Sequence, residues 1–521
     1  MFDPREEMLN RRLSRRTLLQ LMAAGGAGLA AAACGVSTQT TPITKVNAGD
    51  FKIPDSGAKL PTQNVQLRWM DSGDQKAIFF NAFFPAYTKK HPNIAVQYTG
   101  TSWNTIQQSV LLGLRNGTAP DVFQLPSAVT TAQAVQNKWV GAVDDIVPNW
   151  AEVKKRFPVG IFANGVTDFG AKTYGVPFTG NNRINNLMLY DTDYMKAAGY
   201  DPSETPLTWD EFRTALQKIT KKGAGQYYGI IVGLTQAGQL SGMVDTLAEQ
   251  AGAHAASSTT PVVNPLTGHY NFTSDQYLAA VELFLAIKAD GSFFPDSASI
   301  DAPGARGRFP QGVAGVILQG PWNIPAWRAA NASFPLGAAL PPVQKDLASA
   351  FPMSYGPGGS NTWFRSTTTP LGPVIGDIYN YLATLNGQVQ WSEYDGVGDP
   401  AAFPTAIAHA KIDSLSSKSY NWASKWTVLR PEAAVRTPQI STVYQQQIAP
   451  VPTWADTMDG LYTGQISGSV KSVLSALQNR YEASLDTAIK TVNQKQGTNI
   501  TRDDFVFSDW NPHQPYTKLY K

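Results

Sequence analysis

The residues of this chain that could do chemistry are dispersed, and no catalytic or metal-binding motif connects them. The sequence contains no G-x-S-x-G, H-E-x-x-H, G-x-x-x-x-G-K-[ST] or G-x-G-x-x-G, which would mark a serine nucleophile, a zinc site or a phosphate-binding loop. No two histidines stand at metal-ligand spacing among the five present, which are His91, His254, His269, His409 and His513. We therefore predict no catalytic residue, no metal site and no cofactor.

Paired carboxylates are the remaining candidates for catalysis. Asp144-Asp145, or Asp71 with Asp74, could supply the two acids that hydrolyse a glycosidic bond, provided that the fold set them at the required separation. Acids this close in sequence more often lie in a solvated loop. A surface-anchored carbohydrate-active enzyme, such as a glycosidase or a lyase, is therefore an alternative prediction and not the main one.

The start of the chain has the organisation of an export signal. Arg11 and Arg12 open a basic region, and residues 14–19 (SRRTLL) are similar to the twin-arginine signal. The apolar run over residues 18–33 is too short for a transmembrane helix, which needs about 20 residues. We predict a signal peptide over residues 1–33 and export from the cytoplasm.

Cys34, the only cysteine, follows this apolar run directly. The junction resembles a lipobox, although Ala31 stands where leucine is usual, and the resemblance implies that Cys34 is lipid-modified. Residues 34–62 are polar and rich in Thr, Pro and Gly, which predicts a flexible tether. We expect a protein anchored by lipid to the extracytoplasmic face of the cell membrane, in the periplasm or at the cell surface.

The charge balance bears on the kind of partner. The formal net charge is +3, and the five arginines and three acids before Cys34 supply two of these charges. The mature chain is therefore nearly neutral, which argues against nucleic acid as a partner. No later stretch is long and apolar enough to span a bilayer. A body of roughly 450 residues is enough for two or more domains.

The hydrophobic pattern after the tether alternates between strand and helix. Apolar residues recur at every second position over 65–69 and 94–98, and at helical spacing over 78–87 and 106–114, before a short strand at 120–125. This order predicts a parallel α/β sheet with right-handed crossovers. Further on, Thr208-Trp209-Asp210-Glu211 is a capping box that begins a helix.

Several segments in order resemble one known family. Residues 79–96 (FFNAFFPAYTKKHPNIAV), 114–122 (LRNGTAPDV), 174–212, which includes TPLTWDEF, and 315–322 (GVILQGPW) are similar to family 1 extracellular solute-binding proteins, the maltose-binding-protein-like group. The resemblance extends over most of residues 63–495. It implies a type II periplasmic-binding-protein-like fold, in which two discontinuous α/β lobes are joined by hinge strands and a ligand binds in the cleft between them.

The resemblance also implies how the chain divides. We expect lobe 1 over 63–170 plus 313–365, lobe 2 over 171–312 plus 366–495, and a C-terminal tail over 496–521. The cleft residues would follow the carboxyl ends of the strands, where open α/β sheets bind ligands, and include aromatics that stack on a sugar ring. The predicted ligand contacts are Asp71, Ser72, Asp74, Gln124, Thr179, Asn181, Asn182, Trp322, Tyr355, Trp363 and Trp454.

The resemblance implies that the chain is the binding component of an ABC importer. We expect it, as a monomer, to capture a sugar or oligosaccharide and to deliver it to the permease subunits. The 13 tryptophans favour a sugar. A polyamine would need several carboxylates that face one point, and a glycerol phosphodiester would need an arginine such as Arg183 or Arg365. An iron complex and a sensory role that reports to a receptor are further alternatives.

Overall fold

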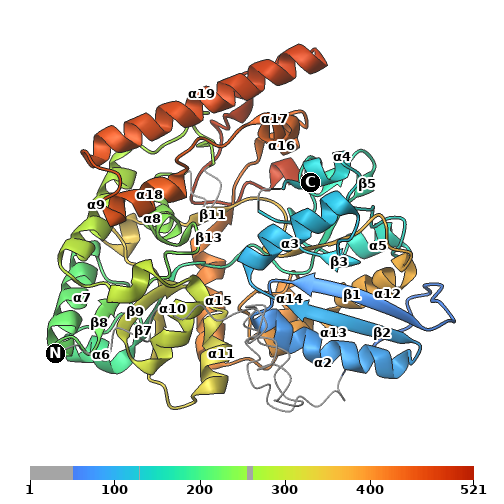
Figure 1. Cartoon of the computed structure of the whole chain (residues 1–521), viewed down its shortest axis with the longest axis horizontal. Helices are drawn as coiled ribbons and strands as arrows, with labels where there is room; N and C mark the ends of the chain where they lie inside the picture. Colours follow the sequence, from blue (N-terminus) through green and yellow to red (C-terminus); the bar gives the residue numbers. More distant parts are fainter. Residues whose placement is uncertain (1–50, 128, 255–261, 521) are drawn as a thin grey trace, which may run out of the picture. The chain divides into compact units, whose positions relative to one another are not determined.

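A computed structural model of the chain confirms the α/β fold, with two mixed sheets that each carry helices on both faces (Figure 1). The structure describes residues 51–127, 129–254 and 262–520. The predicted signal peptide and the lipidation site Cys34 lie outside the described residues. Within these residues, no helix is both long enough and apolar enough to cross a membrane.

The first sheet has five strands in the order β2-β1-β3-β12-β6. β1 pairs in parallel with β2 and β3, and the intervening helices α2 and α3 confirm the predicted alternation. β12 then pairs antiparallel with both β3 and β6. The bounds of these elements are β1 (Val65–Asp71), α2 (Gln75–Lys90), β2 (Ile94–Gly100), α3 (Trp103–Asn116), β3 (Val122–Phe123), β6 (Val176–Pro177) and β12 (Thr362–Arg365).

Alternate residues of these strands enter two different cores, as the period of a strand requires. Leu67 and Trp69 of β1 are fully buried against α2 and the helices α12 (Gly372–Leu382) and α13 (Leu385–Asp395). Phe123 of β3 packs on the opposite face, with the buried side of α3. Each face of the sheet therefore has its own hydrophobic core.

The second sheet has four strands in the order β10-β7-β9-β8. Met188 and Tyr190 of β7 face the largest core, whereas Leu187 and Leu189 face a separate core on the other side. Helices α7, α8 and α9 contribute to the former core and α10, α11 and α15 to the latter. The bounds are β7 (Leu187–Asp191), α7 (Trp209–Gly223), β8 (Tyr228–Ile230), α8 (Gln239–Gln250), α9 (Asp275–Ala289), α10 (Ala302–Arg308), β9 (Ala314–Gln319), α11 (Asn323–Ala330), β10 (Leu336–Ala339) and α15 (Ser414–Trp426).

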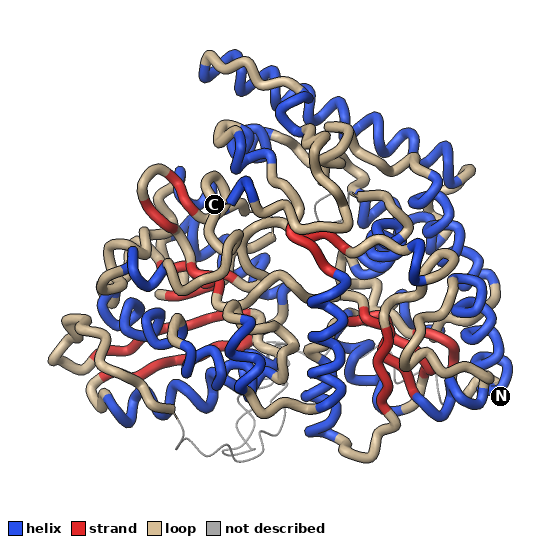
Figure 2. Tube along the Cα trace, turned by 180° about the vertical axis from the view of Figure 1, so that it is seen from behind, coloured by secondary structure: helices blue, strands red, loops and turns tan. Residues whose placement is uncertain are grey.

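Further helices and short strand pairs complete the fold. β11 pairs in parallel with β13, apart from both sheets (Figure 2). The capping box at Thr208 and Glu211 is present at the start of α7, as predicted. The remaining elements are α4 (Thr131–Gln136), α5 (Trp150–Lys154), β4 (Asp168–Phe169), β5 (Lys172–Thr173), α6 (Thr192–Ala197), β11 (Met353–Tyr355), α14 (Pro404–His409), β13 (Thr427–Leu429), α16 (Ala433–Arg436), α17 (Ile440–Gln446), α18 (Trp454–Thr463) and α19 (Val470–Gln496).

The strand pairing groups the chain differently from the predicted lobe segments. β9 was expected to begin the return to lobe 1 at residue 313, but it pairs antiparallel with β7 inside the second sheet. The chain rejoins the first sheet only at β12, and the helices over 372–409 then pack in the first core instead of the second. The reason is burial, because all six residues of β9 are covered by the helices of the second sheet.

The two end segments are more integrated than a tether and a tail would be. Phe51, in the segment expected to be a tether, packs edge-on against Phe79 and Phe83 with ring centroids 5.8 and 5.5 Å apart. At the other end, Phe505 and Trp510 are buried in the core of the second sheet. The described part of the predicted tether, residues 51–62, and the predicted tail therefore both contribute to hydrophobic cores.

Candidate ligand-binding site

The carboxyl ends of β1 and β3 bring several predicted residues together. Asp71, the last residue of β1, is fully buried, and its carboxylate accepts hydrogen bonds from the Tyr98 hydroxyl at 2.7 Å and from the Trp363 indole at 3.2 Å. The backbone N–H of Ser72 donates to the Gln124 side chain at 2.8 Å. This arrangement is the expected one, because parallel neighbours end at the same edge of a sheet.

A second set of bonds extends this network toward β6 and β12. The Gln124 amide donates to the Asn361 side-chain oxygen at 2.8 Å, and the Asn361 backbone N–H donates to the Thr179 hydroxyl at 2.9 Å. Thr179 and Gln124 are both buried. The structure therefore connects Ser72, Gln124 and Thr179 through Asn361, a residue that the sequence analysis missed.

The turn after β1 depends on a glycine and leads to a residue with unusual backbone geometry. Gly73 has φ of +66°, and a Cβ there would lie 3.2 Å from the backbone of Gly100 and Thr101. Asp74 follows with φ of +56°, which few residues other than glycine adopt. Its carboxylate pairs with Arg306 of α10 at 3.1 Å. This ion pair joins the first sheet to a helix of the second.

Next to this turn lies a group of buried charges, which we call the charge cluster. It comprises Lys76, Arg183, Asp395 and Asp399. The Lys76 ammonium lies 3.3 Å from the Asp399 carboxylate, and their side chains are only 5% and 4% exposed. Arg183 pairs with the other oxygen of Asp399, and the Asp395 carboxylate accepts the backbone N–H of Asp399 at 2.6 Å. Two cations therefore share one carboxylate, with a second carboxylate beside it.

Burial perturbs the protonation of this cluster. It raises the pKa of Asp395 to about 7, although the nearby Lys76 and Arg183 act in the opposite direction. Burial also raises the pKa of Asp71. It lowers the pKa of Lys76, and the surrounding acids partly offset that second shift. Such perturbed groups gather at functional sites more often than elsewhere.

Trp322 follows β9 and faces the charge cluster. Its indole is half-buried, and the Arg183 guanidinium carbon lies over the ring at 5.0 Å from the centroid. The ring lies so close to Gly320 that a Cβ at that position would be 1.8 Å from an indole carbon. Glycine is therefore required two residues before Trp322. Trp322, which follows a strand of the second sheet, is therefore in contact with the charge cluster.

Several buried polar atoms around this site have no hydrogen-bond partner within the protein. They belong to residues of the network and the charge cluster, to Gln75 next to Lys76, and to Trp322, which lies against Arg183. Buried polar groups are nearly always paired, because leaving one unpaired costs about 1–3 kcal/mol. The atoms concerned are Ser72 Oγ, Gln75 Oε1, Trp322 Nε1, Asn361 Nδ2 and Asp395 Oδ1. They include both hydrogen-bond donors and acceptors.

The other predicted residues lie in loops and strands that connect the two sheets. The Asn181 amide donates to the carbonyls of Gly356 and Gly358 at 3.1 and 3.2 Å. Asn182 donates to the Tyr420 hydroxyl at 3.4 Å. Tyr355 is half-buried in β11, where burial raises the pKa of its hydroxyl. These contacts explain the positions of Asn181 and Asn182 without a ligand.

Two predicted aromatic contacts are core residues. Trp363 is fully buried in the first core, although its indole reaches Asp71. Trp454 is 1% exposed in the core of the second sheet, where its indole donates to Asp245 at 2.9 Å. Trp454 begins α18, and the rings of Phe272 and Tyr277 pack against it. The packing of α18 therefore buries the predicted ligand contact Trp454 in the core.

Sequence reasoning missed Lys76, Asn361, Asp395 and Asp399 as site residues. Lys76 and Asp399 are separated by 323 positions, so no local spacing could connect them. Arg183 was considered only as a possible phosphate ligand. The one signal present was the short glycine-rich segment before Asn361, which indicates close approach of backbones.

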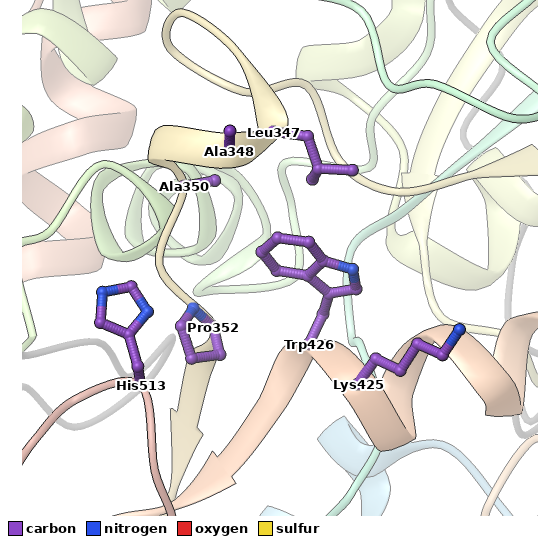
Figure 3. Close-up of a pocket in the computed structure, with 7 residues that line it drawn as sticks. All are labelled: Leu347, Ala348, Ala350, Pro352, Lys425, Trp426 and His513. Carbon is purple, nitrogen blue, oxygen red and sulfur yellow. The ribbon is translucent and has the colours of Figure 1, made fainter.

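A pocket of about 580 Å³ lies elsewhere, next to the last turn of α15 (Figure 3). None of the predicted ligand contacts lines it. Its lining residues are Leu347, Ala348, Ala350, Pro352, Lys425, Trp426 and His513. Among the described residues there is also no group of three or more His, Cys, Asp or Glu side chains that could hold a metal ion.

Comparison with known proteins assigns the chain to a family. Residues 73–385 match the bacterial extracellular solute-binding proteins. The chain belongs to that family. Its members bind solutes, and the matched region contains the second sheet, every strand of the first sheet except β1, and Trp322. An uncharacterized lipoprotein in the oleD 5' region of Streptomyces antibioticus is 29% identical over 140 residues, which are 26% of this chain and 29% of that relative.

Solved structures of solute-binding proteins share the fold. The GacH receptor of Streptomyces glaucescens has a TM-score of 0.60 and 15% identity, over 81% of this chain and 99% of its own. The galacto-N-biose-/lacto-N-biose I-binding protein of Bifidobacterium longum has a TM-score of 0.55 and 16% identity, over 82% and 98%. The sugar-binding protein MalE of Xanthomonas citri has a TM-score of 0.53 and 15% identity, over 83% and 100%.

Proposed function

We propose that this family member is the binding component of an ABC importer, which captures a sugar or oligosaccharide at the charge cluster and Trp322 and delivers it to a permease. The observation that carries the proposal is the group of unpartnered buried donors and acceptors beside a half-buried indole. A sugar presents apolar C–H faces and a rim of hydroxyls, which these two features match. The solved relatives named above bind acarbose, lacto-N-biose or sugars, which supports the same ligand class.

The charges favour a neutral ligand. Both arginines that could have bound a phosphodiester already have partners, because Arg183 pairs with Asp399 and Arg365 lies 3.6 Å from Asp145. Two of the acids that could have bound a polyamine are likewise paired, Asp399 with Lys76 and Asp74 with Arg306. The other two, Asp71 and Asp395, feel the charge of Lys76, which partly offsets the rise in pKa that burial causes in both carboxyl groups. A polyamine or a phosphodiester would have to compete with an existing cation or carboxylate for its partner, whereas a neutral ligand needs no counter-charge.

The remaining features of the proposal follow from the chain's start and from its family. We propose that Cys34 carries the lipid anchor, that export uses the twin-arginine route, and that the protein acts as a monomer on the extracytoplasmic face of the membrane. We also propose that it binds its ligand without converting it. Incubation with a bound sugar, followed by chromatography of the sugar, would reveal any turnover.

The first test is a thermal-shift screen of the purified full chain with mono-, di- and oligosaccharides, a polyamine and a glycerol phosphodiester. A ligand that binds only the folded state stabilises it by about 2.7 kcal/mol at a hundredfold excess over Kd. We expect one sugar class to raise Tm and Trp322→Ala to reduce that shift.

A matched control is Trp422→Ala, because Trp422 is also half-buried under a cation, with the Lys418 ammonium 5.2 Å from its ring. This variant should keep the sugar-induced shift. A Tm shift with the polyamine or the phosphodiester alone would be consistent with the solute-binding family but would contradict a sugar as the ligand. An equal loss in both tryptophan variants would argue against Trp322 as a ligand contact.

A further inference from the structure

Arg183 covers one face of the Trp322 indole. Its guanidinium carbon lies over the indole at 5.0 Å from the ring centroid. A planar guanidinium stacks on aromatic rings as a flat sugar face does. The indole also lies against Gly320, where a Cβ would not fit. A ligand ring cannot stack where the guanidinium now lies.

The surroundings of Arg183 would allow it to move. It lies between β6 and β7 in a segment without helix or strand, and its side chain is 19% exposed. Its anchor is Asp399, which is also paired with Lys76 at 3.3 Å. When Arg183 leaves the ring, Asp399 therefore keeps a cationic partner. The large cost of an unpaired buried charge does not arise.

Polar contacts hold the Arg183 guanidinium in place over the ring. Nε donates to the Asn185 side chain at 2.8 Å, and one terminal nitrogen pairs with Asp399. A sugar stacked on the ring would take the place of the guanidinium. The Trp322 Nε1 is buried without a partner and could donate to the same ligand.

We propose that Arg183 is a specificity-determining residue, which covers the ring of Trp322 in the ligand-free protein and is displaced by a neutral sugar that stacks there. This inference rests on the proposed function, because it takes Trp322 as a ligand contact. Displacement costs the cation–π contact. Ligands that present a flat apolar face to the indole recover that cost, whereas small polyols without such a face do not. Arg183 thus discriminates between the two classes.

The test compares the full chain with Arg183→Met, and the control is Arg213→Met. Arg213 of α7 also forms an ion pair, with Asp290 at 2.6 Å. This pair joins α7 to the end of α9 and is not part of the charge cluster. Calorimetric titration with the sugar that gives a thermal shift should show roughly twofold to thirtyfold tighter binding to Arg183→Met, which corresponds to the usual range of cation–π contacts. Arg213→Met should bind like the unchanged chain. Arg183→Lys keeps a cation beside Asp399 and should change affinity in the same direction by a smaller factor.

A second readout needs no ligand. In protein labelled with 5-fluorotryptophan, the ¹⁹F resonance of Trp322 is identified by its loss in Trp322→Phe. A neutral soluble nitroxide should broaden this resonance more in Arg183→Met than in the unchanged chain, because the cover is gone. Equal broadening in the two proteins would contradict the proposal that Arg183 covers the ring of Trp322. Weaker sugar binding to Arg183→Met would overturn displacement and leave the proposed function intact, whereas no sugar binding to any variant would overturn both.

Discussion

Two of the groups of buried carboxylates in the described part of the chain are neutralised in different ways. In the charge cluster, Asp399 has two cationic partners, and Arg183 comes from a different chain segment than Lys76. In α8, Asp245 and Glu249 depend mainly on neutral donors. Asp245 accepts from the Tyr277 hydroxyl at 2.8 Å and from the Trp454 indole at 2.9 Å, and Glu249 accepts from the Ser354 backbone at 3.0 Å.

The difference separates a site from a scaffold. The charge cluster lies where residues of both sheets meet, since Trp322 follows β9 and Lys76 begins α2 after β1. In the function proposed above, a ligand binds at this cluster. The α8 carboxylates lie within the helices of the second sheet, where aromatic side chains donate to Asp245 and Ser354 donates to Glu249. We therefore expect changes in the charge cluster to alter binding as well as stability, and changes around α8 to alter stability alone.

The largest effect is expected for Lys76→Met. Lys76 pairs with Asp399, and it is also the cation that counteracts the effect of burial on the pKa of Asp71 and on that of Asp395. Its removal leaves several buried carboxylates with less compensation, which should cost about 3–5 kcal/mol. The loss should be greatest at pH 8 and smaller at pH 5. Without Lys76 the folded-state pKa of Asp71 and Asp395 rises further, so protonation at acidic pH restores part of the stability. Urea unfolding at the two pH values measures this, with the exposed Lys89→Met, at the end of the same helix, as a control. Equal losses at both pH values would contradict charge compensation by Lys76.

A smaller effect is expected for Glu249→Gln. Burial raises the pKa of Glu249 to about 7 from 4.5, so the folded state holds a proton that the unfolded state has released between these values. The contribution of Glu249 to the free energy of unfolding is fully present below pH 4.5 and is lost as pH rises to about 7. Because each pKa unit is worth about 1.4 kcal/mol, the amide should raise stability at pH 8 by about 2–4 kcal/mol relative to the unchanged chain.

The same variant should show a flatter stability profile between pH 5 and 8, measured by urea unfolding. Sugar affinity should stay the same, since Glu249 belongs to the α8 group. Exposed Glu152→Gln is the control and should leave the profile unchanged. A lower stability of Glu249→Gln at pH 8 would mean that Arg430, which lowers the pKa of Glu249, compensates its charge better than the present geometry suggests.

The smallest of the three effects is expected for Trp454→Phe. The ring stays in the core, but the indole donor to Asp245 is lost, which should cost about 1–3 kcal/mol of unfolding free energy. Calorimetric titration should give an unchanged sugar affinity. Trp322→Phe is the comparison, with little effect on stability and a clear effect on affinity. Weaker sugar binding by Trp454→Phe at full stability would make Trp454 a ligand contact again.

Local patterns in the sequence determined most of the first sheet. The alternation over 65–125 gave β1, α2, β2, α3 and β3 in their order, because each element is set by its own hydrophobic period. The same reasoning placed Asp71, Ser72 and Gln124 at one sheet edge, since they follow neighbouring parallel strands. It also marked Trp322, which follows the buried strand β9.

What the sequence alone determined, then, is the α/β class, the solute-binding family and the residues that end single strands. Only the tertiary structure decided that β9 belongs to the second sheet, that Trp363 and Trp454 are core residues, and that Lys76 meets Asp399. The physical reason is range. Hydrophobic periodicity acts between neighbours in the chain, whereas strand pairing and charge compensation join residues hundreds of positions apart, and only the packed fold brings them together.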